Sequence, residues 1–274
     1  MMGERAGHGL PRDGVAVLGV PFDGNSSFLK GSAEGPARIL EALNSSSSNL
    51  SCESGLDLGM LDRWASVGDV RVGGGDTFVE DVETAAAELL AGSLRVLALG
   101  GDHSITYPLL RAHARVDPSL TVVHLDAHPD LYDELDGNRL SHACPFARVM
   151  EEQLIGRLVQ IGIRTATPHQ RAQAEGFGVE TIEMRDWTDE VALPDGPCYV
   201  SLDLDVLDPA FAPGVSHREP GGMSVRQVLD IIQRLPGPVI GADIVEYNPL
   251  RDPSGITATV AAKCLKELLA RMVE

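Results

Sequence analysis

The segment TVVHLDAHPD, residues 121–130, joins a short apolar run to three ionisable side chains. The run predicts a buried strand, because branched apolar residues in a short segment are typical of the interior of a parallel sheet. Asp126, His128 and Asp130 follow at intervals of two residues, so they point to one side if the chain stays extended. Burying such groups without a partner costs free energy, which a bound cation would offset. The segment therefore predicts a strand that ends in a metal site.

Similar apolar runs alternate with helical patterns along the chain. This alternation predicts an α/β fold with a parallel sheet covered by helices on both faces. No repeat or linker interrupts it, so we interpret residues 1–274 as a single domain. Asp76 and Ser224 stand where helix N-caps are expected. The expected strands are Val15–Val20, Val67–Val72, Arg95–Leu99, Thr121–Leu125, Leu158–Ile163, Val179–Met184, Cys198–Leu202 and Val239–Ile244, and the expected helices are Phe78–Ala91, Tyr107–Ala114, Cys144–Glu151, Ser224–Arg234 and Thr257–Met272.

The composition narrows the class of protein. A net charge of −18 argues against a nucleic-acid partner, which requires a basic surface, and favours cationic substrates. No apolar stretch is long enough to span a membrane, so no membrane partner is expected. The first 14 residues lack the apolar core of a secretory signal, and the four cysteines are far apart. These features predict a cytoplasmic protein with reduced thiols.

Three further motifs carry metal-ligand side chains, namely GGDHS at residues 100–104, SLDLDVLDP at 201–209 and DIVEYNP at 243–249. His103 follows a glycine pair at the end of an expected strand, and Asp203 and Asp205 follow another. In open parallel sheets the carboxyl ends of the strands form the ligand crevice. We therefore expect the motifs to meet at one edge of the sheet, although each motif alone is also compatible with capping or turn chemistry.

Ligand chemistry indicates which metal the motifs suit. Four carboxylates and two imidazoles without a thiolate favour a fairly hard cation, with manganese first and nickel, cobalt or iron also possible. Shared carboxylates would bridge two ions about 3.5–4 Å apart, and a water between them would ionise near neutral pH. Asp205 is expected to accept a hydrogen bond from the resulting hydroxide and orient it. The expected ligands are His103, Asp126, His128, Asp130, Asp203 and Asp205.

Two other residues suggest a carbon electrophile for that hydroxide. His142 lies in the loop after the metal cluster, where it could pass a proton to a leaving amine. Glu246 follows a strand and could pair with a planar guanidinium. The glycines at 73–75 lack the Lys-Ser/Thr of a phosphate-binding loop. The alternative interpretations are an exposed loop histidine for His142 and a helix-cap or interface charge for Glu246.

With these motifs assembled, the sequence resembles the ureohydrolases, the family of arginases and agmatinases, and is most similar to their plant-type arginase branch. The resemblance extends from about Val17 to Arg271. It is carried by G-G-D-H-S at Gly100, D-A-H-x-D at Asp126, S-x-D-x-D-x-x-D-P at Ser201 and D-I-V-E-x-N-P at Asp243, together with longer matches such as NSSFLKG and GNRLSHACPFARVME.

The resemblance implies a three-layer α/β/α fold around a central, mostly parallel eight-stranded sheet. It implies two Mn²⁺ ions per subunit, held by the six ligands named above, and hydrolysis of a guanidino group to urea and an amine. By match to the family motifs, His142 takes the proton-shuttle position and Glu246 the guanidinium-binding position, so both would contact substrate. Homotrimers or homohexamers are implied as well.

Arginine, giving ornithine, is the first expected substrate, and agmatine, giving putrescine, is the second, with other guanidino compounds as a further alternative. The segment from Leu131 to Leu140 is expected to line the pocket for the substrate tail. Arg139 there would favour a carboxylate and hence arginine. The acids Asp133, Glu134 and Asp136 would instead favour the terminal ammonium of agmatine.

Two other classes of protein remain as alternatives. A zinc amide hydrolase of similar fold would need one zinc ion and fewer carboxylates, which the presence of both His103 and Asp130 disfavours. A metal-stabilised binding protein without catalysis would tolerate the loss of His142 or Glu246, whereas an enzyme would not.

Overall fold

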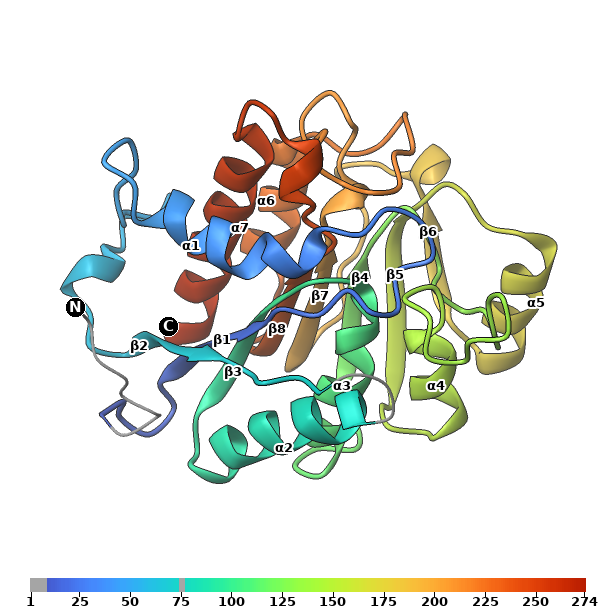
Figure 1. Cartoon of the computed structure of the whole chain (residues 1–274), viewed down its shortest axis with the longest axis horizontal. Helices are drawn as coiled ribbons and strands as arrows, with labels where there is room; N and C mark the ends of the chain where they lie inside the picture. Colours follow the sequence, from blue (N-terminus) through green and yellow to red (C-terminus); the bar gives the residue numbers. More distant parts are fainter. Residues whose placement is uncertain (1–8, 74–76) are drawn as a thin grey trace.

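One parallel sheet of eight strands forms the centre of the molecule, in the order β2-β1-β3-β8-β7-β4-β5-β6 (Figure 1). The computed structural model describes residues 9–73 and 77–274. The strands are β1 Val15–Val20, β2 Trp64–Asp69, β3 Arg95–Gly100, β4 Thr121–Leu125, β5 Arg157–Ile163, β6 Glu180–Glu183, β7 Cys198–Asp203 and β8 Val239–Val245. The helices are α1 Gly35–Leu43, α2 Phe78–Ala91, α3 Thr106–Ala114, α4 Pro145–Glu151, α5 Pro168–Phe177, α6 Val225–Arg234 and α7 Ile256–Val273.

Helices cover both faces of the sheet, which confirms the three-layer α/β/α prediction. Helices α1, α6 and α7 pack on one face and α2 to α5 on the other (Figure 1). Strand β1 shows the division, because Val15 and Val17 join the first core cluster whereas Leu18 and Val20 join the second. Alternate side chains of an extended strand point to opposite faces, so a strand between two helical layers is apolar along its whole length.

The predictions were least accurate at the two edges of the sheet. The expected strand Val67–Val72 begins three residues earlier, at Trp64, and Val179–Met184 is shortened to Glu180–Glu183. Both edge strands are partly exposed and carry polar residues, so an apolar run does not mark their ends. Helices α1 and α5 were both missed. The sequence of α5, PHQRAQAEGF, is largely polar, whereas the short α1, GPARILEAL, buries Ile39 and Leu43 and begins with a Gly-Pro pair that resembles a loop.

Helix starts follow local capping chemistry. At Ser224, Oγ accepts a hydrogen bond from the Gln227 N–H at 3.2 Å, and the Ser224 N–H donates to Gln227 Oε1 at 2.9 Å, which confirms the predicted N-cap. The same capping box, missed in the sequence, starts α5 at Thr167 and Gln170. Asp76, the other predicted cap, lies outside the described residues. Within residues 9–73 and 77–274, no helix combines the length and apolarity needed to cross a membrane.

The four motif-bearing strands are neighbours in the middle of the sheet. Strands β3, β8, β7 and β4 are consecutive in the sheet order, and all run parallel. Their carboxyl ends therefore lie along one edge, and the motifs that begin at Gly100, Asp126, Ser201 and Asp243 all reach it. The expected convergence is a consequence of this strand order.

Gly101, directly after β3, links the carboxyl ends of β1 and β8 through its backbone. Its N–H donates to the Val20 carbonyl at 3.0 Å, and its carbonyl accepts from the Glu246 N–H at 2.8 Å. A Cβ at this position would lie 1.9 Å from the Phe22 carbonyl oxygen, which is backbone and cannot rotate away. A glycine is therefore required where β1, β3 and β8 approach one another.

Replacing Gly101 tests this close approach. Gly101→Ala is expected to lower the free energy of unfolding by about 1–3 kcal/mol or more, because the added methyl overpacks a rigid contact. Gly176→Ala in α5 is the matched control, since Gly176 is exposed and a Cβ there meets nothing within 4 Å. The control should stabilise by about 0.5–1 kcal/mol. Equal unfolding midpoints in urea for both variants would contradict the argument.

Candidate metal centre

Three carboxylates from the ends of β4 and β7 surround the Nδ1 atom of His103, which follows β3. Carboxylate oxygens lie 3.2 Å from this nitrogen at Asp126 Oδ2, 3.0 Å at Asp130 Oδ2 and 3.1 Å at Asp203 Oδ2. His103 and Asp126 are fully buried. Three oxygens and one nitrogen directed at the same small volume form a first group that could hold a cation.

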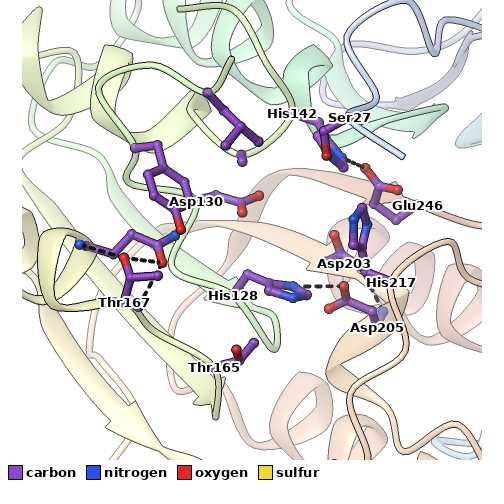
Figure 2. Close-up of a pocket in the computed structure, with 14 residues that line it drawn as sticks. Ser27, His128, Asp130, His142, Thr165, Thr167, Asp203, Asp205, His217 and Glu246 are labelled. Atoms are coloured by element: carbon purple, nitrogen blue, oxygen red, sulfur yellow. Dashed lines mark hydrogen bonds and ion pairs between the residues drawn. The ribbon is translucent and has the colours of Figure 1, made fainter. Parts of the chain in front are cut away.

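A second group shares one residue with the first. The Nδ1 atom of His128 lies 3.3 Å from Asp126 Oδ1. It also lies 3.0 Å from Asp205 Oδ2 (Figure 2). Asp126 thus offers Oδ2 to the first group and Oδ1 to the second, the arrangement expected of a bridging carboxylate. All six residues predicted as ligands are therefore placed together.

Tight turns place the ligands, and the predicted extended strand does not continue through them. Strand β4 ends at Leu125, and Asp130 has φ of 50°, in the left-handed region. The turn is closed by the His128 N–H, which donates to Asp126 Oδ1 at 2.6 Å. Asp205 likewise lies in a 3₁₀ turn and donates its N–H to Asp203 Oδ1 at 2.8 Å. Aspartates readily bond the backbone two residues on, so they close these turns themselves.

Hydrogen bonding leaves His103 Nδ1 free for an ion. Ser201 Oγ donates its hydrogen to Asp243 Oδ1 at 2.8 Å, so it accepts from His103 Nε2 at 3.0 Å. The hydrogen of the neutral ring is then on Nε2, and Nδ1 has no hydrogen-bond partner among the described residues. Burial would lower the pKa of His103, but the hydrogen bonds that a protonated Nδ1 makes to the three carboxylates raise it well above its ordinary value. Positive charge is therefore favoured at Nδ1, and a metal ion there would take the place of the proton.

The carboxylates themselves also require compensation. Burial raises the pKa of Asp203 well above its usual range, with the charges of Asp205 and Asp126 adding to the effect. Burial likewise raises the pKa of Asp205 to about 6, although the His128 charge opposes the rise. Without a cation the centre must take up protons. With divalent cations bound, all four carboxylates can ionise, so the oxygen-rich donor set fits a hard metal ion.

His142 and Glu246 form a pair beside the two groups. Glu246 Oε1 lies 2.7 Å from His142 Nδ1 and accepts from the His103 N–H at 2.9 Å. His142 Nε2 lies 2.7 Å from Ser27 Oγ, a partner the sequence did not reveal. Both members of the pair are buried, so the alternative of an exposed loop histidine is wrong. Glu246 has φ of 65°, and this left-handed turn accompanies the placement of its carboxylate in the cavity.

The pair is charged at neutral pH. Burial would lower the pKa of His142, but the charge of Glu246 and the hydrogen bond to it raise the pKa to about 9. Burial would raise the pKa of Glu246, but the charge of His142 and the hydrogen bonds from His142 and the His103 N–H together lower it. His142 therefore holds a proton that it can donate.

A cavity of about 230 Å³ opens from the metal groups toward neutral side chains. Thr165 and Thr167 lie on the side away from Glu246 (Figure 2), and Tyr132 and Gln170 also line the cavity. His217 is a further lining residue, stacked at an angle against His142 with 5.2 Å between ring centroids. Away from the metal groups and the His142–Glu246 pair, this lining is uncharged and mixes hydroxyl, amide and apolar side chains.

The charged residues expected at the substrate tail lie elsewhere. Arg139 pairs with Glu151 at 2.8 Å, and Asp133 pairs with His169 at 3.0 Å. Of the residues that the structure describes between 131 and 140, only Tyr132 and Leu135 line the cavity. None of Asp133, Glu134, Asp136 and Arg139 lines the cavity, so the structure gives the expected contact of these residues with a substrate tail no support. Arg139 and Asp133 are paired with Glu151 and His169 instead.

His124 was also missed, although a signal for it was available. It precedes Asp126 by two residues, the same interval that separates Asp126, His128 and Asp130. Its Nε2 atom lies 2.7 Å from Asp126 Oδ2, so His103, His124 and Asp126 form a cluster of possible ligands. His124 was not predicted as a site residue because an imidazole within an apolar strand is ordinarily a core residue.

Comparison with known proteins agrees with this geometry. Residues 13–270 match the model of the Arginase family. The chain belongs to the arginase family. Arginase 1, mitochondrial, from Oryza sativa subsp. indica is 46% identical over 276 residues, covering 94% of this chain and 81% of the relative. Arginase 1, mitochondrial, from Arabidopsis thaliana is 45% identical over the same length and coverage. The solved arginase from Medicago truncatula is 44% identical with a TM-score of 0.90, covering 94% of this chain and 87% of that one.

The names of these arginases contradict the expected cytoplasmic location. The rice and Arabidopsis relatives are both mitochondrial proteins by name. The expectation depended on the absence of an apolar signal core from the first residues. An apolar core is a feature of secretory signals, whereas mitochondrial targeting segments are amphipathic and lack one, so its absence says nothing of this compartment. The inference from composition to compartment was therefore wrong.

The division of Asp126 between the two groups can be tested by counting ions. His128→Ala removes a donor from the second group alone, so the variant is expected to retain fewer divalent ions per chain than the unaltered protein, about one where two are expected. Asp126→Asn weakens both groups and should retain less. Metal content after equilibrium dialysis gives the measurement, and Asp133→Asn, outside the cavity, is the control. An Asp126→Asn protein with undiminished metal content would refute the bridging arrangement.

Proposed function

We propose that this chain is an arginase that hydrolyses arginine to ornithine and urea with two Mn²⁺ ions per subunit. The single observation that carries the proposal is the shared carboxylate of Asp126, with the His142–Glu246 pair opening on the same cavity. His103, Asp126, Asp130 and Asp203 would hold one ion, and His128, Asp126 and Asp205 the other. When bound, the ions would supply Lewis acidity and lower the pKa of a coordinated water. Assembly into trimers or hexamers stays a prediction.

Asp205 orients the attacking water. Its Oδ1 accepts the Ala127 N–H at 3.1 Å, and this bond fixes the carboxylate, while Oδ2 is directed toward His128. An ionised carboxylate accepts hydrogen bonds only, so it holds the O–H of a water and directs the oxygen lone pair elsewhere. The guanidinium carbon of the substrate lies in that direction when Glu246 holds the guanidinium in the same cavity.

Glu246 positions the guanidinium group. Its Oε1 is already occupied by His103 and His142, and none of the described residues bonds Oε2. A guanidinium N–H is a suitable donor to this ionised oxygen, and the planar group would be held over the attacking water. The low pKa of Glu246 keeps the carboxylate ionised for this contact.

His142 supplies the proton that the departing amine needs. Attack of water on the guanidinium carbon must be followed by cleavage of its bond to the side-chain nitrogen. That nitrogen leaves as an amine only after protonation. His142 holds a proton at neutral pH, and Ser27 Oγ is placed to accept from or exchange with its Nε2.

The uncharged outer lining favours arginine over agmatine. Arginine ends in an ammonium and a carboxylate whose charges cancel, and hydroxyl and amide groups can hydrogen-bond to both. Agmatine ends in an uncompensated ammonium, which would be best held by a carboxylate. Beyond the metal groups and Glu246, no carboxylate is found among the cavity-lining residues that the structure describes.

Urea release from a panel of guanidino compounds tests the proposal. Manganese-loaded protein should release urea fastest from arginine, and agmatine should react with a markedly lower kcat/KM. Glu246→Gln should lower kcat/KM for arginine about 10- to 100-fold, because a hydrogen bond to a charged group contributes ~1.5–3 kcal/mol. No urea from any compound would reject the function, and a preference for agmatine would reject the substrate assignment.

The charge state of His142 predicts the pH dependence. Its raised pKa of about 9 means that the donating form is present at neutral pH and disappears as pH rises through that value. The rate should therefore rise as the attacking water ionises and fall again above about pH 9. His142→Asn should lose roughly 10²–10⁴ in rate together with the falling limb. A falling limb of unchanged position in that variant would assign the proton to another group.

A further inference from the structure

Two buried polar residues lie directly beneath the shared carboxylate and have no part in the chemistry proposed above. His124 on β4 and Gln160 on β5 are opposite one another in the parallel register, and neither is exposed. His124 Nε2 lies 2.7 Å from Asp126 Oδ2, and its Nδ1 lies 3.0 Å from Gln160 Nε2. The three side chains thus form a continuous line that ends at the bridging position.

The carbonyl of Pro129 decides which way the Gln160 amide points. The Gln160 Nε2 atom lies 2.6 Å from the Pro129 oxygen, which can only accept a hydrogen bond. The reversed amide would place two acceptor oxygens against each other, so the amino group must face Pro129. Its second hydrogen is then directed at His124, and the Gln160 oxygen is left without a partner among the described residues.

This orientation fixes the tautomer of His124. Because Gln160 donates to Nδ1, that nitrogen carries the lone pair and the ring hydrogen is on Nε2. The Nε2–H then donates to Asp126 Oδ2. A nitrogen that carries a hydrogen is no metal ligand, so His124 is excluded as a direct ligand despite its place in the cluster with His103.

We infer that His124 is a positioning residue that holds the Asp126 carboxylate in its bridging orientation, with Gln160 fixing the imidazole. The inference rests on the metal centre of the proposed function. The His124 ring cannot turn easily, because the Phe146 ring covers it at 4.0 Å between centroids. Gln160 also ties down the backbone at Pro129, between the ligands His128 and Asp130. One amide on β5 therefore restrains both the bridging carboxylate and the ligand turn.

A pair of His124 variants isolates the single N–H that the inference requires. His124→Phe keeps the ring and removes the donor, and His124→Gln restores an N–H at about the same distance along the side chain. The Mn²⁺ affinity of the metal-free chain, measured by calorimetric titration without substrate, should fall about 10- to 100-fold in His124→Phe. It should lie within about threefold of the unaltered protein in His124→Gln, with two ions bound in both variants.

Two results would overturn the inference. Unchanged affinity in His124→Phe would show that the donor is dispensable. Loss of one ion from both variants alike would show that the imidazole itself is a ligand. The titration needs no substrate, so a chain that binds two ions and releases no urea would reject the proposed function and leave this inference intact.

Gln160→Met gives a second test if His124→Phe fails to fold. Methionine is close to glutamine in length and lacks both amide hydrogens. The variant therefore loses the hydrogen bond that fixes the His124 tautomer and the hydrogen bond to the Pro129 carbonyl. Affinity for Mn²⁺ should fall about tenfold or more. Gln173→Met on α5, outside the cavity, is the matched control for the substitution itself. Equal affinity in Gln160→Met and Gln173→Met would refute the positioning role of Gln160.

Discussion

Asp126 offers one carboxylate oxygen to each of two imidazole-centred groups in a buried site, and the other parts of the centre depend on this division. A carboxylate so far from water is unstable unless positive charge or hydrogen-bond donors surround it. The His128 N–H and the His124 ring bond the same carboxylate from the protein side. The remaining lone pairs are directed at the two sites where cations would bind. Hydrogen bonds thus fix the carboxylate, and the metal charge makes its burial tolerable.

The order of the strands explains how residues far apart in sequence meet at this carboxylate. Strands β3, β8, β7 and β4 are consecutive in the sheet although they are not consecutive in the chain. Crossover connections make these strands parallel, so all their carboxyl ends lie at one edge of the sheet. Helices on both faces exclude water from the strands. Gly101 permits the closest approach among β1, β3 and β8. The fold therefore supplies a rigid edge on which short turns carry the reactive groups.

Fold class followed from the sequence because its signals are local. The apolar run of β4 and the periodic pattern of α2 predicted their observed bounds. A strand buried on both faces is a continuous apolar run, and a helix buried along one side has a periodic apolar pattern, so the local sequence is enough to find both. The edge strands β2 and β6 and the polar helix α5 were displaced or missed. The burial of these elements depends on the segments that pack against them in space, which cannot be identified from the residues of the element alone.

By itself, the sequence determined which residues could bind metal, because carboxylates and imidazoles next to apolar strands are costly to bury in any other role. Only the tertiary structure decided how they do it. It replaced the expected extended segment by a turn with Asp130 in the left-handed region, and it paired Arg139 with Glu151 away from the cavity. It also gave His124 a hydrogen-bond partner on another strand. Each outcome depends on which groups lie within about 3 Å, and that distance is set by chain segments remote in sequence.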